Sequence, residues 1–353
     1  MIKYLQIGNK INLKYHYNKK QTKFKIQMAN TGYKITTYKD KNPYSPTFNT
    51  TKEEKEYNED LCPTRNYYTS ISFDINTESH TNFYPSDYFK IDKIRTYDKK
   101  RNITIDWGDG TVEELSLKPE VDNTFEHFYT DGQHNYTVNV KSRGNEYSGI
   151  AMFQIYYREP MDKPLPPQRV TKINKIITNE LITIGNFIYS NVDEYDVPEE
   201  WKFKGFDKNF KLIINERYPE DGKPNNLDMI SFLGCFQTEI KDISSVTHTI
   251  ELPKRLFANV RRNTVSLNST FLNINFNDYD VSLFTGNINE ILDGLDLNKV
   301  DDVYRCFEDQ RGLTGEALPI IAQLSHLTSD KYANCFRHCT GLSDYDQIPS
   351  DWK

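Results

Sequence analysis

The chain has 353 residues, of which 44 are basic and 50 acidic, and its formal net charge is -6. This length favours two or three domains, and the acidic balance argues against a main partner that is a nucleic-acid backbone. Residues 1–41 are an exception, because ten lysines and a single acid, Asp40, give them a charge of +9 and leave -15 for the rest. Such a segment is suited to docking on an acidic surface, and the alternative is a solvated lysine-rich face.

Two further features bear on where the protein works. The first 20 residues have scattered lysines in place of the apolar core of a secretory signal, and no run approaches the ~18 apolar residues of a membrane span. We therefore expect a chain made in the cytoplasm that does not insert into a membrane. The five cysteines form no CxxC pair and one CxxxC, Cys335 to Cys339, so we expect buried free thiols in place of a zinc site.

Residues 1–66 are expected to form a β-rich docking region. Apolar and polar residues alternate over residues 1–30, which predicts a β-hairpin or a short meander. Residues 38–66 lack periodicity and predict a long loop. The lysines of this region that are candidates for docking are Lys10, Lys14, Lys19, Lys20, Lys23 and Lys25.

The stretch NITIDWGDGTVEEL, residues 102–115, predicts a second hairpin. Ile103, Ile105 and Trp107 alternate with polar residues, as a half-buried strand requires. The following Gly-Asp-Gly, residues 108–110, tolerates the positive φ of a tight turn, and the apolar pattern then restarts.

Two motifs in this part of the chain resemble the repeats of the polycystic-kidney-disease (PKD) family, which are immunoglobulin-like sandwiches. The first is WGDGT, and the second is FEHFYTDGQHNYTVNV, in which an H-x-Y corner and a glycine precede a tyrosine-bearing strand. The resemblance covers Tyr67 to Tyr157 and implies that the tryptophan packs in the core while the aspartate caps its turn. The motif residues are Trp107, Gly108, Asp109, Gly110, His127, Tyr129 and Tyr136.

Two chemical alternatives exist for the same hairpin. Asp106 and Asp109 could bind calcium, but the D-x-D-x-D-G spacing and the distal glutamate of a calcium loop are missing. Either aspartate could also pair with Glu113 or Glu114 for glycoside hydrolysis, which needs a cleft and one carboxyl with a raised pKa. A hairpin tip leaves such groups solvated, so we expect no catalytic residue, no metal and no cofactor here.

A proline-rich connector follows. YYREPMDKPLPPQRV holds four prolines within eight residues, which suits an extended linker and excludes a helix or a central strand. We therefore expect an immunoglobulin-like domain over 67–159, a linker over 160–169 and a last domain over 170–353.

The last domain shows a repeat. Phe236, Phe271, Phe307 and Phe336 recur at intervals of 35, 36 and 29 residues. A unit of this length cannot bury its own apolar face, so successive units must stack their phenylalanine, leucine and cysteine residues into one ladder. The cysteines are then small core-filling residues.

The clearest unit, CFRHCTGLSDYDQIPSDW, resembles the BspA-like leucine-rich repeats, in which an F-x-x-C-x-x-L core precedes an I-P turn. The preceding unit fits in part, with Gln310 where the cysteine would stand, and the two earlier units are degenerate. The last unit is expected to be completed by a neighbour or capped by Trp352. The residues that fit the pattern are Phe307, Leu313, Phe336, Cys339, Leu342 and Pro349.

The expected fold class is thus mainly β and multidomain, with a β-rich N-terminal region, an immunoglobulin-like sandwich and a short leucine-rich-repeat-like α/β solenoid. The sequence has no HExxH, Walker or GxGxxG motif, so we do not expect an enzyme. Both modules are interaction scaffolds on a chain without an export signal. Virion proteins of tailed phages combine these properties, since they are made in the host cytoplasm and act outside the cell.

We therefore expect a structural or adhesion protein of a tailed-phage virion, such as a head or tail fibre, decoration or tail-accessory subunit. Its partners would be other virion subunits or a host-surface protein or glycan, with neither nucleic acid nor membrane insertion, and it would form a homo-oligomer. One alternative is a bacterial cell-surface adhesin with the same modules. A second is a carbohydrate-binding or carbohydrate-active protein.

Overall fold

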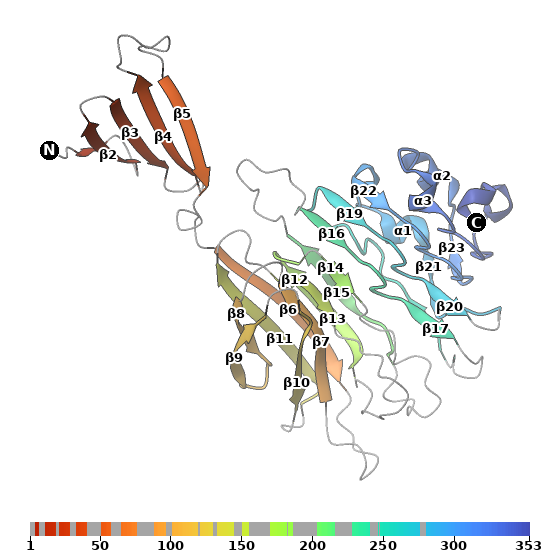
Figure 1. Ribbon diagram of the computed structural model, residues 1–353. Coiled ribbons are helices and arrows are strands. Elements are labelled where there is room, and N and C mark those ends of the chain that lie inside the picture. Colours follow the sequence, from red (N-terminus) through yellow and green to blue (C-terminus); the bar gives the residue numbers. More distant parts are fainter. Residues whose placement is uncertain are drawn as a thin grey trace. The chain divides into compact units, whose positions relative to one another are not determined.

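The computed structural model (Figure 1) describes residues 4–6, 11–18, 21–28, 33–40, 51–57, 65–75, 88–96, 101–118, 121–129, 133–144, 150–154, 170–181, 183–185, 203–215, 228–240, 246, 248–275 and 280–353. The chain divides into two compact units. The first is built mainly on Met1–Asn66, and the second on Tyr67–Ser142, Ser148–Tyr218 and Asn225–Lys353. Strands greatly outnumber helices, which confirms the prediction of a mainly β protein.

The first unit is an antiparallel sheet whose strands are adjacent in chain order. The strands are β1 (Tyr4–Gln6), β2 (Ile11–Asn18), β3 (Gln21–Met28), β4 (Tyr33–Asp40) and β5 (Thr51–Tyr57). The predicted hairpin corresponds to β2 and β3. The sequence predicts a loop over 38–66, whereas β4 extends to Asp40 and TKEEKEY forms β5. An edge strand needs no buried face and is often charged, so its sequence lacks the apolar alternation of an inner strand.

The second unit contains two large sheets. The six-stranded sheet has the order β15 (Phe206–Ile214), β13 (Val170–Thr178), β6 (Arg65–Ile75), β11 (Asn135–Gly144), β8 (Arg101–Asp106) and β9 (Val112–Leu117). The seven-stranded sheet has the order β10 (Asn123–Phe128), β7 (Tyr88–Thr96), β12 (Ile150–Gln154), β14 (Thr183–Gly185), β16 (Met229–Ser231), β19 (Thr264–Ser266) and β22 (Val300–Asp302).

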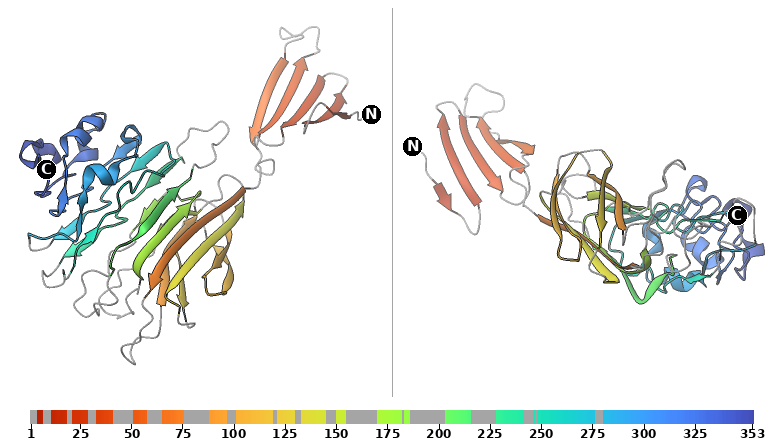
Figure 2. Two further views of the ribbon diagram at one scale, coloured as in Figure 1. Left: turned by 180° about the vertical axis from the view of Figure 1, so that it is seen from behind. Right: turned by 90° about the horizontal axis from the view of Figure 1, so that it is seen from below.

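Both sheets change from antiparallel to parallel pairing. β13 is antiparallel to β6 and parallel to β15, and β12 is antiparallel to β7 and parallel to β14. Figures 1 and 2 show the result: orange and yellow antiparallel strands lie on one side of the green strands, and the teal and blue repeat units lie on the other. Each of these repeat units from β16 onward carries one of the recurring phenylalanines and is called a coil. One cluster of buried residues runs from Ile71 to Trp352.

The expected limits at 159 and 170 therefore do not coincide with a limit between compact units. The connector at 160–169 lies outside the described residues, but strands from both sides of it share the two sheets. A local sequence pattern marks a strand without naming its partner, which is why this continuity is not visible in the sequence.

Shorter elements complete the second unit. The strands are β17 (Thr238–Ile240), β18 (Ile250–Glu251), β20 (Asn273–Asn275), β21 (Phe284–Asn287) and β23 (Leu313–Thr314). The helices are α1 (Ile288–Leu292), α2 (Leu318–Gln323) and α3 (Ser329–Tyr332), with 3-10 turns η4 (Leu297–Lys299), η5 (Tyr345–Gln347) and η6 (Ser350–Trp352). Within the described ranges, no helix has the length and apolar character needed to cross a bilayer.

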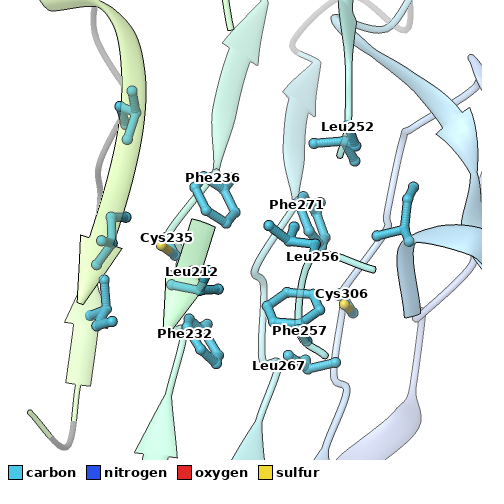
Figure 3. Close-up of a cluster of buried hydrophobic side chains, with 14 of the residues drawn as sticks. Leu212, Phe232, Cys235, Phe236, Leu252, Leu256, Phe257, Leu267, Phe271 and Cys306 are labelled. Atoms are coloured by element: carbon cyan, nitrogen blue, oxygen red, sulfur yellow. The ribbon is translucent and has the colours of Figure 1, made fainter. Parts of the chain in front are cut away.

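The recurring phenylalanines form a buried column. The ring centroids of Phe236 and Phe271 are 5.5 Å apart, those of Phe271 and Phe307 5.3 Å, and those of Phe307 and Phe336 5.8 Å. Figure 3 shows the first two rings on neighbouring coils, with buried cysteines beside them. Trp352 continues the column at 6.1 Å from Phe336, so the structure shows the expected stacking and an aromatic cap within the chain.

A left-handed turn precedes each ring of the column. The residues two positions before the four phenylalanines are Gly234, Ser269, Arg305 and Asn334, with φ values of 61°, 53°, 53° and 59°. The backbone bonds also repeat, since Phe271 N donates to Cys306 O and Phe307 N donates to Cys335 O, each at 2.9 Å. The coils therefore share one backbone path even where their sequences have diverged.

Candidate interaction sites

The turn between β8 and β9 is held by its own carboxylates. Gly108 N donates to Asp106 Oδ1 at 3.1 Å, and Thr111 N donates to Asp109 Oδ1 at 2.8 Å. Gly108 and Gly110 have φ values of 90° and 94°, which glycine adopts without a steric penalty. Asp109 caps this turn, as the resemblance implies.

Trp107 lies at the centre of an aromatic cluster. Its buried ring stacks on His127 with centroids 4.9 Å apart, and its Nε1 donates to Glu113 Oε1 at 3.0 Å. Its carbonyl accepts a hydrogen bond from the hydroxyl of Tyr129 at 2.8 Å, and Tyr129 stacks on Tyr136 at 3.7 Å. The residues chosen from the two sequence motifs are thus brought together, with Trp107 in the core.

The carboxylate of Asp109 is fully engaged. Its Oδ2 lies 2.7 Å from His127 Nε2, and only 11% of the Asp109 side chain is exposed. Burial is the largest single influence on the pKa of Asp109 and raises it, but the hydrogen bonds from His127 and Thr111 outweigh it, so the pKa lies below its ordinary value.

This environment does not suit Asp109 itself as a general acid or as a calcium ligand. A general acid needs a raised pKa, whereas that of Asp109 is lowered. A calcium ion needs several free oxygens, whereas both oxygens of Asp109 contact protein groups. In the part of the chain that the structure describes, no group of three or more His, Cys, Asp or Glu side chains could hold a metal ion.

The predicted repeat residues lie in successive coils. Phe307, Leu313, Phe336, Cys339 and Leu342 are buried, while Pro349 is exposed. The Sγ of Cys339 donates to Phe307 O at 2.9 Å.

Gln310 takes the place of a cysteine in the preceding coil. Its Nε2 donates to Phe271 O at 2.6 Å, as Cys339 does to Phe307 O one coil further on. The departure of this unit from the family pattern therefore preserves the contact between neighbouring coils.

The described cysteines are core residues. Cys235, Cys306, Cys335 and Cys339 are free and buried, and burial raises the pKa of each thiol. A raised pKa keeps the thiols protonated and poorly nucleophilic at neutral pH, which agrees with a packing role. Cys62 lies outside the described residues.

Three of the candidate docking lysines lie on neighbouring strands of the first unit. Lys14 is on β2, and Lys23 and Lys25 are on β3. The register pairs Lys14 with Lys25, and residues two apart on a strand share a face, so all three occupy neighbouring positions on one face of the sheet. Lys10, Lys19 and Lys20 lie outside the described residues.

A groove of about 710 Å³ opens on the second unit, where the short strands of the coils begin. Residues from four successive coils line it, among them Thr249, Asp280, Arg311 and Thr340. These residues are not recognisable as a site in the sequence, because they come from four segments separated by about a repeat each. The available signal was their position just before the aligned apolar residues of each unit.

Two glycines allow the coils to approach each other along the groove. A Cβ atom on Gly312 would lie 2.6 Å from Phe284 O, and one on Gly341 would lie 2.5 Å from Leu313 O. Gly312 N also donates to the hydroxyl of Ser282 at 2.7 Å. Only glycine fits these two positions, so this wall of the groove is close-packed backbone.

One charge pair crosses the groove wall between coils. Arg311 Nη1 donates to Asp280 Oδ1 at 3.1 Å, and Arg311 Nη2 lies 3.9 Å from Asp309 Oδ1. The side chain of Arg311 is 15% exposed and that of Asp280 is 89% exposed. The groove thus presents an open carboxylate beside a largely covered guanidinium.

Comparisons with protein families, with curated proteins and with solved structures give no match. The two family resemblances therefore rest on the motif residues alone, and function has to be inferred from the geometry.

Proposed function

We propose that this protein is a non-enzymatic structural and adhesion protein of a tailed-phage virion, such as a head or tail fibre, decoration or tail-accessory subunit. The observation that carries the proposal is the division into a lysine-bearing sheet unit and a second unit with an open groove. A particle protein of this kind has to attach at one place and recognise at another, and two compact units provide both functions.

Within this proposal, the antiparallel half of the second unit is a PKD-like immunoglobulin-type sandwich and the coils are a leucine-rich-repeat-like solenoid. The carboxylate-capped WGDGT turn with its buried tryptophan supports the first assignment. The repeated left-handed turns and the phenylalanine column support the second.

The states of the reactive groups also favour binding over chemistry. The raised pKa of the buried thiols keeps them protonated and poorly nucleophilic at neutral pH, and the carboxylate of Asp109 is engaged by His127 and Thr111. These groups hold the scaffold together.

The first unit is the docking part in this proposal. Lys14, Lys23 and Lys25 occupy neighbouring positions on one face of the sheet, and we propose that this face contacts an acidic face of another virion subunit. Several copies on one particle would raise the avidity of weak receptor contacts.

The test is peptide mass spectrometry of purified particles from the source of the gene, with light scattering to measure the mass of the isolated protein. Peptides of this chain at a fixed stoichiometry in virions are the expected result. A monomer recovered only from bacterial cell envelopes would overturn the virion role and indicate a cell-surface adhesin.

The docking surface is tested separately with the triple variant Lys14→Glu, Lys23→Glu and Lys25→Glu. We expect its incorporation into particles to fall at least tenfold. The matched control reverses three exposed lysines of the second unit: Lys204→Glu, Lys208→Glu and Lys211→Glu. Equal losses in both variants would mean that net charge, and not this face, controls incorporation.

A further inference from the structure

We propose that the groove on the coils binds a neutral oligosaccharide. This inference rests on the proposed function, because it names the class of host-surface molecule that the second unit would recognise. The groove volume of about 710 Å³ falls within the range of roughly 300–1,000 Å³ that is typical of ligand sites.

The charges of the groove favour a neutral ligand. The described residues of its lining include one carboxylate, Asp280, one guanidinium, Arg311, and one imidazole, His248. Because Arg311 is bonded to Asp280 and lies near Asp309, its positive charge is already compensated. These described residues therefore offer no uncompensated positive charge to hold an anion, so acidic glycans and nucleic acids fit poorly.

The hydrogen-bonding groups match sugar hydroxyls. A hydroxyl both donates and accepts, so two adjacent sugar hydroxyls can donate to the carboxylate of Asp280 and accept from other groups of the groove. Thr249 and Thr340 lie at the exposed rim on other coils. Within the described part of the chain, neither threonine hydroxyl is engaged in a hydrogen bond. Each can therefore bond to a ligand.

The apolar content of the groove is too small for a protein anchor. Protein interfaces draw most of their affinity from large side chains buried in apolar pockets. The apolar side chains among the described residues of the lining are those of Val246 and Val281. None of these described residues is aromatic, so the contacts that they offer to a sugar are mainly hydrogen bonds. We therefore expect a weak dissociation constant, on the order of 1 mM for a single site.

The length of the groove indicates a short chain of sugar rings. β18 pairs with β21, and β21 pairs with β23, in a parallel ladder. The fourth coil is joined to this ladder by Ser343, whose backbone N donates to the carbonyl of Gly315 on the third coil. Three steps of about 4.8 Å give a span of about 14 Å. An extended ligand can reach from Thr249 to Thr340 across this span.

The test uses the full-length protein, displayed on streptavidin to raise avidity, on an array of neutral, sialylated and sulfated oligosaccharides. The best neutral compound is then titrated by isothermal calorimetry and by saturation-transfer NMR. We expect binding to neutral compounds. Retention by acidic glycans only, or by none of the array, would overturn the proposal.

Two variants locate the site. Asp280→Ala removes the exposed carboxylate, and Thr340→Arg fills the groove from another coil. We expect each variant to weaken binding about tenfold or more. Asp280→Ala loses charge-assisted hydrogen bonds to the ligand, and Thr340→Arg occupies space that the ligand needs. Asp346→Ala, at an exposed carboxylate outside the groove, is the matched control and should bind as the parent does. Unchanged binding by both groove variants would also contradict the site.

The outcome is independent of the virion test. Peptides found in particles together with no binding of neutral glycans would remove the groove proposal and leave the structural role. Binding of neutral glycans by a protein found only in cell envelopes would remove the virion role and leave the groove proposal.

Discussion

The hairpin region around Trp107 and the coils from β16 onward are stabilised in different ways. In the hairpin region each polar group has a partner of its own, such as His127 for Asp109 and Glu113 for the indole of Trp107. In the coils a single arrangement recurs, consisting of a left-handed turn, a buried ring and a backbone bond to the next coil. The first region depends on particular residues, whereas the second depends on repetition.

Repetition makes individual turn residues replaceable. The four equivalent turns use glycine, serine, arginine and asparagine, although only glycine adopts a positive φ without strain. The bonds on both sides of each coil compensate for this strain, as expected when every unit is stabilised by its neighbours.

The largest expected effects come from removing a large side chain from two different parts of the buried core. Trp107→Ala and Phe307→Ala should each lower the free energy of unfolding by about 3–5 kcal/mol, because both side chains are buried. Denaturant unfolding measures the loss. Hydrogen exchange should locate it within 101–144 for the first variant and in the coils on both sides of 307 for the second.

Leu233→Ala is the control for this pair, since the side chain is 50% exposed and should change stability by less than about 0.5 kcal/mol. A cost below about 1 kcal/mol for Phe307→Ala would show that the ring column does not hold the coils together.

Substitutions at two glycines distinguish the cost of steric overlap from the cost of backbone strain. A Cβ on Gly341 would approach two carbonyl oxygens, at 2.5 and 2.6 Å, so Gly341→Ala should cost about 1–3 kcal/mol. Gly110 has open space around it but a φ of 94°, so Gly110→Ala should cost about 1 kcal/mol. Thermal or denaturant unfolding measures both costs. A larger cost at Gly110 than at Gly341 would mean that backbone strain matters more than close packing.

An effect of similar size to those at the two glycines is expected for the carboxylate of the hairpin. Asp109→Asn removes the carboxylate that bonds to His127 and Thr111 and should cost about 1–2 kcal/mol at pH 7. Because folding lowers the pKa of Asp109, its contribution is present above the unfolded pKa of about 3.9 and is lost as the pH falls through the lower folded value. The stability difference between parent and variant should therefore shrink from pH 7 to pH 3 in urea titrations. A difference that is independent of pH would mean that the charge of Asp109 has no role.

The sequence revealed local features of the fold better than distant pairings. The WGDGT turn and the phenylalanine interval are visible, because turn chemistry and burial leave a local pattern. Ser269 and Arg305 carry no sign of a positive φ in the sequence, because serine and arginine rarely adopt it, whereas Asn334 is of a residue type that does so more often. The sharing of sheets across 160–169 was equally hidden, because strand partners are chosen by tertiary packing.

The groove was hidden for a related reason. Asp280 and Arg311 are 31 residues apart and become neighbours only when the coils stack. In the sequence each is one charged residue before an apolar strand, which is a common and uninformative position.

The change of pairing at β12 and β13 gives the coils a starting surface for assembly. A stack of parallel coils has no inherent first unit, and its non-local pairings form slowly. Here the antiparallel strands β6 and β7 bring β13 and β12 into position, and these in turn offer a ready edge to β15 and β14. We therefore expect the antiparallel strands to act as a template during folding, so that the coils assemble in one direction, outward from these strands toward Trp352.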